Sequence, residues 1–271
     1  MFVFYMPLSS SWIPEDSLLL EHISPQRREK VLRYRRIPDR RLSLYAALTV
    51  RMGLSRLSGL PASQLAFDCP SGKKPVCLTL PSWDFSLSHT EGAILCCIAG
   101  CQKEGKVRCE KVDCEKAACK KMRCEKVSCE KVGCDIEGLA PAPLEIMPRI
   151  FHPEEIAYIQ KGSPADQNQR FFQLWTRKEA YVKQLGTGIT DDLNRLNLLN
   201  GLTTESASNL LIESTTKPTI KLLTESTTEP LSTFLHTWQE DHYICTVASS
   251  RPCDKPQVRR LREEDLRGAL Q

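Results

Sequence analysis

The stretch QRFFQLWTRKEAYVKQLGTG, residues 169–188, predicts a long helix in the second half of the chain. Helix-forming residues continue without a break until Gly186 and Gly188, which are typical of a helix end. Glu179 and Lys183 are four positions apart, so they share one face of that helix. They could form an ordinary surface ion pair, or Glu179 could supply one carboxylate to a larger site.

The segment GCDIEG, residues 133–138, lies upstream of this helix and could complete such a site. On an extended backbone, residues two positions apart point to the same face, so the side chains of Asp135 and Glu137 would project together. An acid-x-acid pair is common on exposed strands, and a metal ion would need a third ligand. With Glu179, the pair would offer the carboxylate oxygens that Mg²⁺ prefers, beside water and substrate phosphates.

A third polar segment precedes both of these motifs. FSLSHTEGAILCCIAG, residues 85–100, predicts a polar turn that leads into a short buried strand. Ser88 and His89 fall in the turn, where the histidine could donate a hydrogen bond to a phosphate. A lone histidine is more often structural, so this segment alone indicates little.

The remaining regular segments suggest that two similarly built halves carry these motifs. Residues 42–60 predict a core helix that ends at Gly59. Residues 143–159 predict a further helix, and residues 242–250 predict a strand. Each half would therefore combine helices with strands.

Composition narrows the class of protein. The chain has 271 residues, of which 41% are hydrophobic and 26% charged, so it can bury a substantial core. The apolar opening lacks a basic segment, and no stretch approaches the roughly 18 apolar residues of a membrane span, so we expect a cytoplasmic protein without a membrane partner. The 13 cysteines are expected to be reduced, because neither an export signal nor a small disulfide scaffold is visible.

Six of the cysteines recur every five residues, and we interpret them as part of an inserted loop. They are Cys109, Cys114, Cys119, Cys124, Cys129 and Cys134. A step of five would scatter them around a helix and alternate them on a strand, and paired zinc brackets are absent. We expect a low-complexity surface loop at 101–132, because lengthening a loop adds little closure entropy. The expected parts are therefore residues 1–100, the insert, and residues 133–271 with a Ser/Thr-rich insert near 203–230.

Positive charge is concentrated in two segments. The net charge of +4 is matched by residues 101–132 alone, so the rest of the chain is neutral. Residues 26–41 carry eight basic residues, which could form a solvated helix face or bind phosphates and an acidic partner. A polyanion-binding protein stays open as an alternative, but aromatic residues are not interleaved with the charge and we expect no nucleic-acid partner.

Four motifs in order carry a resemblance to a known family. GKKP (72–75), FSLSHT (85–90), GCDIE (133–137) and WTRKEAYVK (175–183) resemble the surfactin-synthetase-activating type of 4′-phosphopantetheinyl transferase. ISPQRREKVLRY, residues 23–34, is also similar to the start of that family. The resemblance covers most of the chain apart from the two inserts.

The resemblance implies an α/β (α+β) fold, a pseudo-dimer of two similar halves with coenzyme A in the cleft between them. It also implies a monomeric, Mg²⁺-dependent enzyme that transfers 4′-phosphopantetheine from coenzyme A to a serine of an acyl or peptidyl carrier protein. The other product would be 3′,5′-ADP. Because Walker and G-x-S-x-G motifs are absent, we expect direct transfer without an enzyme-bound intermediate.

The family motifs imply roles for individual residues. Asp135, Glu137 and Glu179 would bind Mg²⁺. The contacts with coenzyme A would be Arg27, Lys30, Lys74, Ser88, His89 and Lys183, with Lys73 as an alternative to Lys74. Glu155, next to Glu154, occupies the position of a glutamate proposed as the general base.

One departure from the family pattern is visible at Leu42, where an arginine is usual. Arg40 or Arg41 would have to replace it, and loss of such a phosphate contact would cost about 1.5–3 kcal/mol of binding. A second concern is the insert, which could shift Asp135 and Glu137 out of register. A non-catalytic relative therefore also stays open.

Overall fold

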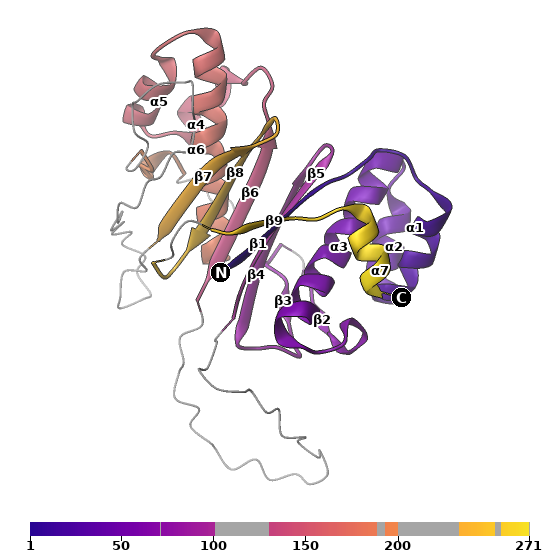
Figure 1. Ribbon diagram of the computed structural model, residues 1–271. Helices are drawn as coiled ribbons and strands as arrows, with labels where there is room; N and C mark the ends of the chain where they lie inside the picture. The colour runs from indigo at the N-terminus through magenta and orange to yellow at the C-terminus, as the bar shows by residue number, and fades with distance from the viewer. Residues whose placement is uncertain (71, 101–129, 189–192, 200–232, 253–255, 271) are drawn as a thin grey trace, which may run out of the picture.

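The computed structural model describes residues 1–70, 72–100, 130–188, 193–199, 233–252 and 256–270. Most of the cysteine repeat and the Ser/Thr-rich segment near 203–230 lie outside these residues, so their interpretation as surface loops stays a prediction. The described residues form helices packed on sheets, which confirms the expected mixed α/β class (Figure 1). No helix in the described ranges combines the length and apolar character of a membrane span.

The N-terminal half is built around one long helix and a four-stranded sheet. The helices are α1 (Pro14–Leu19), α2 (Pro25–Arg33) and α3 (Ile37–Ser58); the strands are β1 (Phe2–Pro7), β2 (Phe67–Asp68), β3 (Val76–Cys77), β4 (Trp83–Thr90) and β5 (Ala93–Gly100). The main sheet has the order β4-β5-β1-β9, where β9 (Val258–Arg260) comes from a much later segment of the chain, and β2 pairs with β3 separately. Gly59 ends α3 in the left-handed conformation, as predicted, with φ of 77°.

The polar turn expected around Ser88 and His89 is wrong. Both residues lie within β4, where Ser88 pairs with Leu95 of β5, and the hairpin turn follows at Glu91 and Gly92. The alternation of Asp84, Ser86 and Ser88 with apolar residues is typical of a strand, but their polar side chains were interpreted as a turn; in the structure they face the second half of the molecule.

The C-terminal half repeats the same order of elements. Its elements are β6 (Val132–Gly138), α4 (Met147–Ile150), α5 (Pro153–Gln160), α6 (Pro164–Leu185), β7 (Phe234–Glu240) and β8 (Tyr243–Ser249). The antiparallel sheet has the order β6-β8-β7, which corresponds to β1-β5-β4 in the first half. In both halves a strand leads through short helices into a 22-residue helix, and a hairpin follows later.

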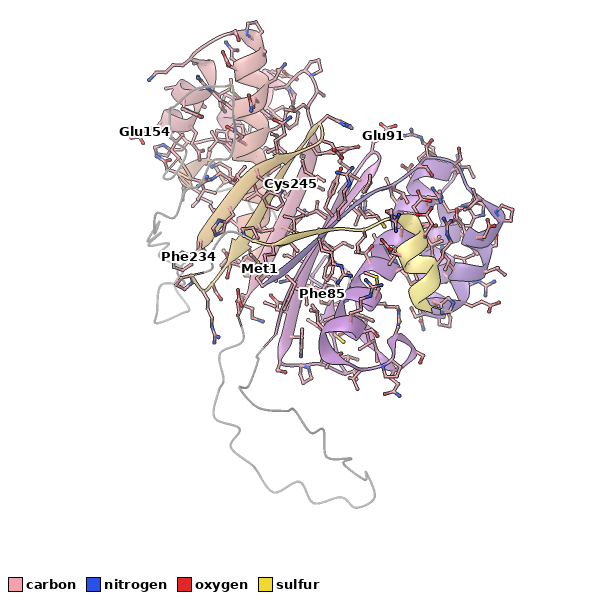
Figure 2. The ribbon with its side chains drawn as sticks, viewed as in Figure 1. Met1, Phe85, Glu91, Glu154, Phe234 and Cys245 are labelled. Atoms are coloured by element: carbon pink, nitrogen blue, oxygen red, sulfur yellow. The ribbon has the colours of Figure 1, made fainter. Side chains whose placement is uncertain are left out.

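Apolar side chains join the two sheets. The shared cluster takes Val3, Tyr5, Leu95 and Cys97 from the first half and Cys134, Ile136, Cys245 and Val247 from the second. Figure 2 shows side chains filling this space near the labelled Met1 and Cys245. Full burial of each aliphatic side chain contributes about 1.5–3 kcal/mol, so this cluster holds the two halves together.

The last part of the chain returns to the N-terminal half. β9 (Val258–Arg260) pairs in parallel with β1, and α7 (Glu263–Leu270) lies beside α3 (Figure 1). Leu261 and Leu266 are buried in the core of the N-terminal half. The structure therefore corrects the expected boundary at 133–271, because residues 258–270 pack with the first half. This long-range pairing leaves no local pattern in the sequence.

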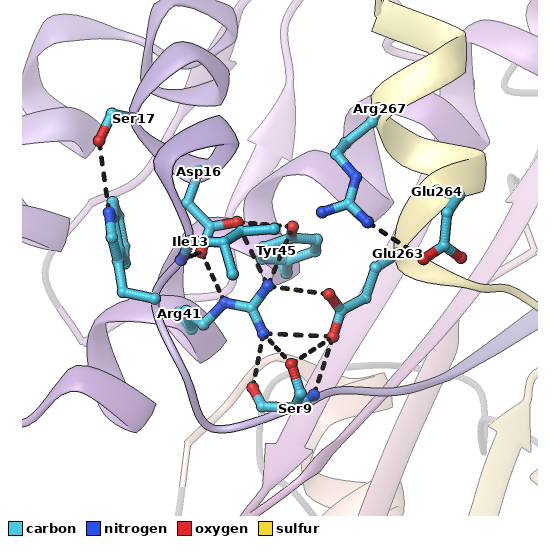
Figure 3. A network of polar contacts seen from close by, with 10 residues as sticks. Ser9, Ile13, Asp16, Ser17, Arg41, Tyr45, Glu263, Glu264 and Arg267 are labelled. Atoms are coloured by element: carbon cyan, nitrogen blue, oxygen red, sulfur yellow. Dashed lines mark hydrogen bonds and ion pairs between the residues drawn. The ribbon is translucent and has the colours of Figure 1, made fainter.

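A buried polar network fastens α7 to the first half (Figure 3). Arg41, which is 0% exposed, donates from Nε to Asp16 Oδ2 at 2.6 Å and from Nη2 to Glu263 Oε2 at 2.8 Å. The Tyr45 hydroxyl donates to Asp16 Oδ1 at 2.7 Å. Removing one partner would leave a buried charge unpaired, which typically costs about 3–5 kcal/mol.

Candidate active site

Three predicted site residues from three elements meet where the halves join. Ser88 of β4 donates from Oγ to Asp135 Oδ1 of β6 at 2.7 Å. Lys183 of α6 donates from Nζ to the same Oδ1 at 2.5 Å and to Ser88 Oγ at 3.0 Å. Lys183 therefore pairs with β6 rather than forming only a surface contact along its own helix.

The second oxygen of Asp135 is available for a further ligand. Asp135 is 2% exposed, and its Oδ2 has no hydrogen-bond partner among the described residues. Burial raises the pKa of this carboxyl, and the Lys183 ammonium offsets part of the rise. A buried oxygen without a partner costs about 1–3 kcal/mol, so it is a suitable position for a cation.

Two further carboxylates lie close enough to Asp135 for its charge to raise their pKa. Burial, followed by the negative charge of Asp135, raises the pKa of Glu137 to about 7, with a smaller contribution from Glu179. Burial and Asp135 likewise raise the pKa of Glu179. Trp175 Nε1 donates to Glu137 Oε1 at 3.2 Å and orients it. Because the three negative charges oppose one another, a divalent cation between them would be stabilising.

The donor set fits Mg²⁺ in part. Within the described ranges, no three His, Cys, Asp or Glu side chains form a ready metal cage. Mg²⁺ does not require one, because it commonly uses one or two carboxylates and takes its other ligands from water and substrate phosphates. The buried oxygen of Asp135 and the carboxylates of Glu137 and Glu179 are consistent with that pattern.

Gly133 explains why α6 lies so close to β6. A Cβ atom at this position would lie 1.9 Å from the carbonyl oxygen of Ala180 and 2.5 Å from the amide nitrogen of Gln184. Only glycine permits this approach, which places Lys183 beside Asp135. We did not single out Gly133 from the sequence; the available signal was a glycine inside a strand pattern, which indicates close backbone contact.

A positive region lies at the N-terminal side of the site. His89 is exposed, and its pKa is lowered by partial burial and then by the positive charges of Lys183 and Arg27. Arg27 donates from Nη2 to the carbonyl oxygen of Ser43 at 2.9 Å, and the buried Ser43 Oγ has no partner among the described residues. Sequence reasoning missed Ser43. Lys30 is exposed on the same helix as Arg27.

A pocket of about 270 Å³ adjoins His89, and only residues of the N-terminal half line it. Its lining consists of Tyr34, Arg36, Pro38, Asp39, Leu42, His89, Thr90 and Glu91. Leu42 therefore presents an apolar wall where the family pattern has an arginine.

Lys74 is held at the base of the same junction. Its Nζ donates to Asp84 Oδ2 at 2.6 Å and to the carbonyl oxygen of Val132 at 2.7 Å. The neighbouring Lys73 is exposed. Sequence reasoning did not identify Asp84, because its partners lie in distant segments.

The structure corrects the expected contact of Arg41 with coenzyme A. Its guanidinium is enclosed between Asp16 and Glu263, so it cannot reach a ligand at the site. Arg40 is also engaged elsewhere, since Nη2 donates to the carbonyl oxygen of Tyr34 at 2.9 Å. The expected replacement for Leu42 is therefore not provided by Arg41.

The structure also corrects the expected role of Glu155 as general base. Glu155 is 0% exposed, and its Oε2 accepts from the backbone amide of His152 and from Lys178 Nζ, both at 2.8 Å. Its Oε1 accepts from the amide of Leu198 at 2.7 Å. The carboxylate thus caps α5 and ties it to α6, with both oxygens occupied.

Comparison with known proteins agrees with these motifs. Residues 131–248 match the model of the 4′-phosphopantetheinyl transferase superfamily. The chain is 25% identical over 192 residues to a 4′-phosphopantetheinyl transferase of Bacillus subtilis and 26% identical over 192 residues to 4′-phosphopantetheinyl transferase Sfp of Bacillus subtilis (strain 168), covering 71% of each chain. A putative 4′-phosphopantetheinyl transferase of Synechocystis is 36% identical over 53 residues, 20% of this chain and 22% of that protein.

The matched regions include the segments that form the site described above. The region matched by the superfamily contains Asp135, Glu137, Glu179 and Lys183, and the longer matches extend beyond it. The matches therefore support the identification of the chain as a 4′-phosphopantetheinyl transferase, similar to enzymes of the surfactin-synthetase-activating type.

Proposed function

We propose that this protein transfers 4′-phosphopantetheine from coenzyme A to a serine of an acyl or peptidyl carrier protein and releases 3′,5′-ADP. The observation that carries the proposal is the buried Oδ2 of Asp135, which has no hydrogen-bond partner among the described residues and lies beside Lys183, with Glu137 and Glu179 close enough for the charge of Asp135 to raise their pKa. Negative carboxylates with one ammonium group suit a magnesium diphosphate better than a bare polyanion.

We further propose that the molecule is a monomeric pseudo-dimer that binds coenzyme A between its halves. The matching strand orders β4-β5-β1 and β7-β8-β6 support the internal repeat. The meeting of Ser88, Asp135 and Lys183 supports a ligand site at the junction. Residues 258–270 then belong to the first half.

Each side chain would have a distinct role in binding the substrate. Asp135, Glu137 and Glu179 would hold Mg²⁺, which when bound would neutralise charge on the diphosphate oxygens. Lys183 would add a positive charge beside the same oxygens.

The basic region would hold the 3′-phosphoadenosine end. Arg27, Lys30 and His89 contribute positive or donor groups there, and Ser88 and Lys74 lie between that region and β6. Arg36 in the adjoining pocket could extend the same field. Such contacts would orient the diphosphate so that the carrier serine meets its β-phosphorus in line.

Transfer would be direct, with no covalent enzyme intermediate. Cys134, which adjoins Asp135, is 0% exposed and its Sγ donates to the carbonyl oxygen of Leu95 at 3.4 Å, so a substrate cannot reach it. Burial raises the pKa of Cys96 and Cys97 well above the usual range, so these thiols stay neutral near pH 7 and are poor nucleophiles. The oxygen of the carrier serine would form the new P–O bond as the bond to 3′,5′-ADP breaks. The serine proton would leave to solvent or to a base other than Glu155.

The test is to incubate the protein with coenzyme A, Mg²⁺ and a panel of apo carrier proteins, and to weigh each carrier by intact mass spectrometry. A phosphopantetheine-sized gain that requires Mg²⁺ and is lost in Glu179→Gln would support the proposal. Coenzyme A that fails to bind, measured by calorimetry, would contradict it. Salt-sensitive DNA binding without labelling would favour the polyanion alternative.

A further inference from the structure

The strands β4 and β6 lie side by side, yet they are edges of separate sheets. Side chains make the connection that a backbone ladder would normally make. Asp84 Oδ2 accepts from the amide of Val132 at 2.8 Å, and Ser86 Oγ accepts from the amide of Cys134 at 3.1 Å. Asp84, Ser86 and Ser88 occupy alternate positions, so all three point from one face of β4.

Lys74 and Asp84 together satisfy both backbone groups of one residue. Lys74 Nζ donates to the carbonyl oxygen of Val132, while Asp84 accepts from its amide. The two side chains also pair directly at 2.6 Å and are only 16% and 8% exposed. The pair thus replaces the two hydrogen bonds that an adjacent strand would supply at the start of β6.

This arrangement fixes how the two halves align. The ladder with β8 sets the register of β6 within its own sheet, where Asp135 pairs with Thr246. It does not fix β6 relative to the first half. Apolar packing between the sheets is non-directional, so it tolerates small shifts along the strands that hydrogen bonds do not.

We propose that Asp84, together with Lys74, and Ser86 are positioning residues that align β6 with β4 and so bring Asp135 beside Ser88 and Lys183. This inference rests on the proposed transferase function for its kinetic consequences. A displacement of about 1 Å at a catalytic group can cost up to about 100-fold in rate, so loss of this alignment would be visible in turnover. Asp84 and Ser86 themselves would not touch the substrate.

The main test compares Asp84→Asn with the unchanged protein. Asparagine keeps the size of the side chain but removes the charge that holds Lys74. We expect about a tenfold or greater fall in kcat, a higher Mg²⁺ concentration at half-maximal rate, and faster amide hydrogen exchange in the peptide covering 130–138. Hydrogen exchange is measured by mass spectrometry on the ligand-free protein. Ser86→Ala should speed exchange in the same peptide, and it serves if Asp84→Asn does not fold.

Asp16→Asn provides the matched control. Asp16 is also a buried aspartate paired with a basic side chain, but its partner is Arg41 beneath α7. This variant should lower Tm without changing the Mg²⁺ requirement or exchange at 130–138. The proposal is overturned if Asp84→Asn leaves amide exchange at 130–138 unchanged. It is also overturned if Asp84→Asn and Asp16→Asn lower Tm by similar amounts and change kcat and the Mg²⁺ requirement equally.

A double variant separates alignment from a direct contact of Lys74 with coenzyme A. If the pair acts as a unit, Lys74→Met and Asp84→Asn should each speed amide hydrogen exchange in the peptide 130–138 to a similar extent. The double variant should then exchange little faster than either single variant. If Lys74 contacts only coenzyme A, its variant would raise KM and leave exchange unchanged, which would contradict the pairing. Hydrogen exchange is measured without a carrier protein, so it tests the proposed alignment of β6 with β4 even if the transferase function proves wrong.

Discussion

A single methyl group at position 133 should push helix α6 away from strand β6. In Gly133→Ala the new Cβ would lie 1.9 Å from the carbonyl oxygen of Ala180, whereas real Cβ atoms essentially never approach closer than 3.0 Å. The obstacle is backbone, so rotation of a side chain cannot relieve it. Helix α6 and strand β6 would have to part by about 1.1 Å.

That shift is large compared with the contacts of the site. Lys183 Nζ and Asp135 Oδ1 are 2.5 Å apart, and a shift of about 1.1 Å would part them to about 3.6 Å, beyond hydrogen-bond distance. Overpacking typically costs about 1–3 kcal/mol of folding free energy, and displaced catalytic groups can lose up to about 100-fold in rate. We expect both losses in Gly133→Ala.

Thermal unfolding and kcat, measured side by side, test this reasoning. Gly138→Ala is the matched control, because it lies on the same strand and its Cβ would meet Tyr243 at an ordinary 3.7 Å. The control should retain nearly normal Tm and turnover. Normal Tm and kcat in Gly133→Ala would refute the idea that close packing at this glycine positions Lys183.

Three further predictions concern the metal, the cap of α5 and the fastening of α7. Mg²⁺ at 100 times its Kd should stabilise the folded protein by about 2.7 kcal/mol in thermal unfolding, and Asp135→Asn should remove most of that response; an equal response would exclude Asp135 as a ligand. Glu155→Gln should cost about 3–5 kcal/mol of folding stability, because it leaves Lys178 buried without its counter-ion. At temperatures below the melting range, kcat of this variant should fall towards low pH as it does in the unchanged protein. Loss of that fall in kcat would show that Glu155 is the general base. Arg41→Met should lower Tm and expose α7 to proteolysis without altering KM for coenzyme A, whereas a raised KM at unchanged Tm would indicate a direct contact.

The sequence predicted those features that depend on neighbouring residues. The helix ends at Gly59 and Gly186 follow from glycine's access to positive φ, and both were found where expected. The alternation in GCDIEG predicted that Asp135 and Glu137 belong to one strand, β6. These signals are local, so a single sequence contains them.

Features that depend on distant partners were beyond the same reasoning. Arg41 looked like any exposed basic residue in a charged segment, but Glu263, which lies 222 residues away, encloses it. Glu155 sits in a motif suited to chemistry, yet Lys178 and the amide of Leu198 occupy its oxygens. Asp84 gained its role only when the fold brought Val132 beside it.

The return of residues 258–270 to the first half also constrains the order in which the protein can fold during synthesis. One of the two neighbours of β1 in the sheet, β9, is synthesised about 250 residues after β1. Until then the edge of β1 is open, and the pocket for Leu261 and Leu266 is empty. The N-terminal half should therefore complete its folding only after residues 258–270 have been translated, and a fragment that lacks them would be a poor candidate for expression.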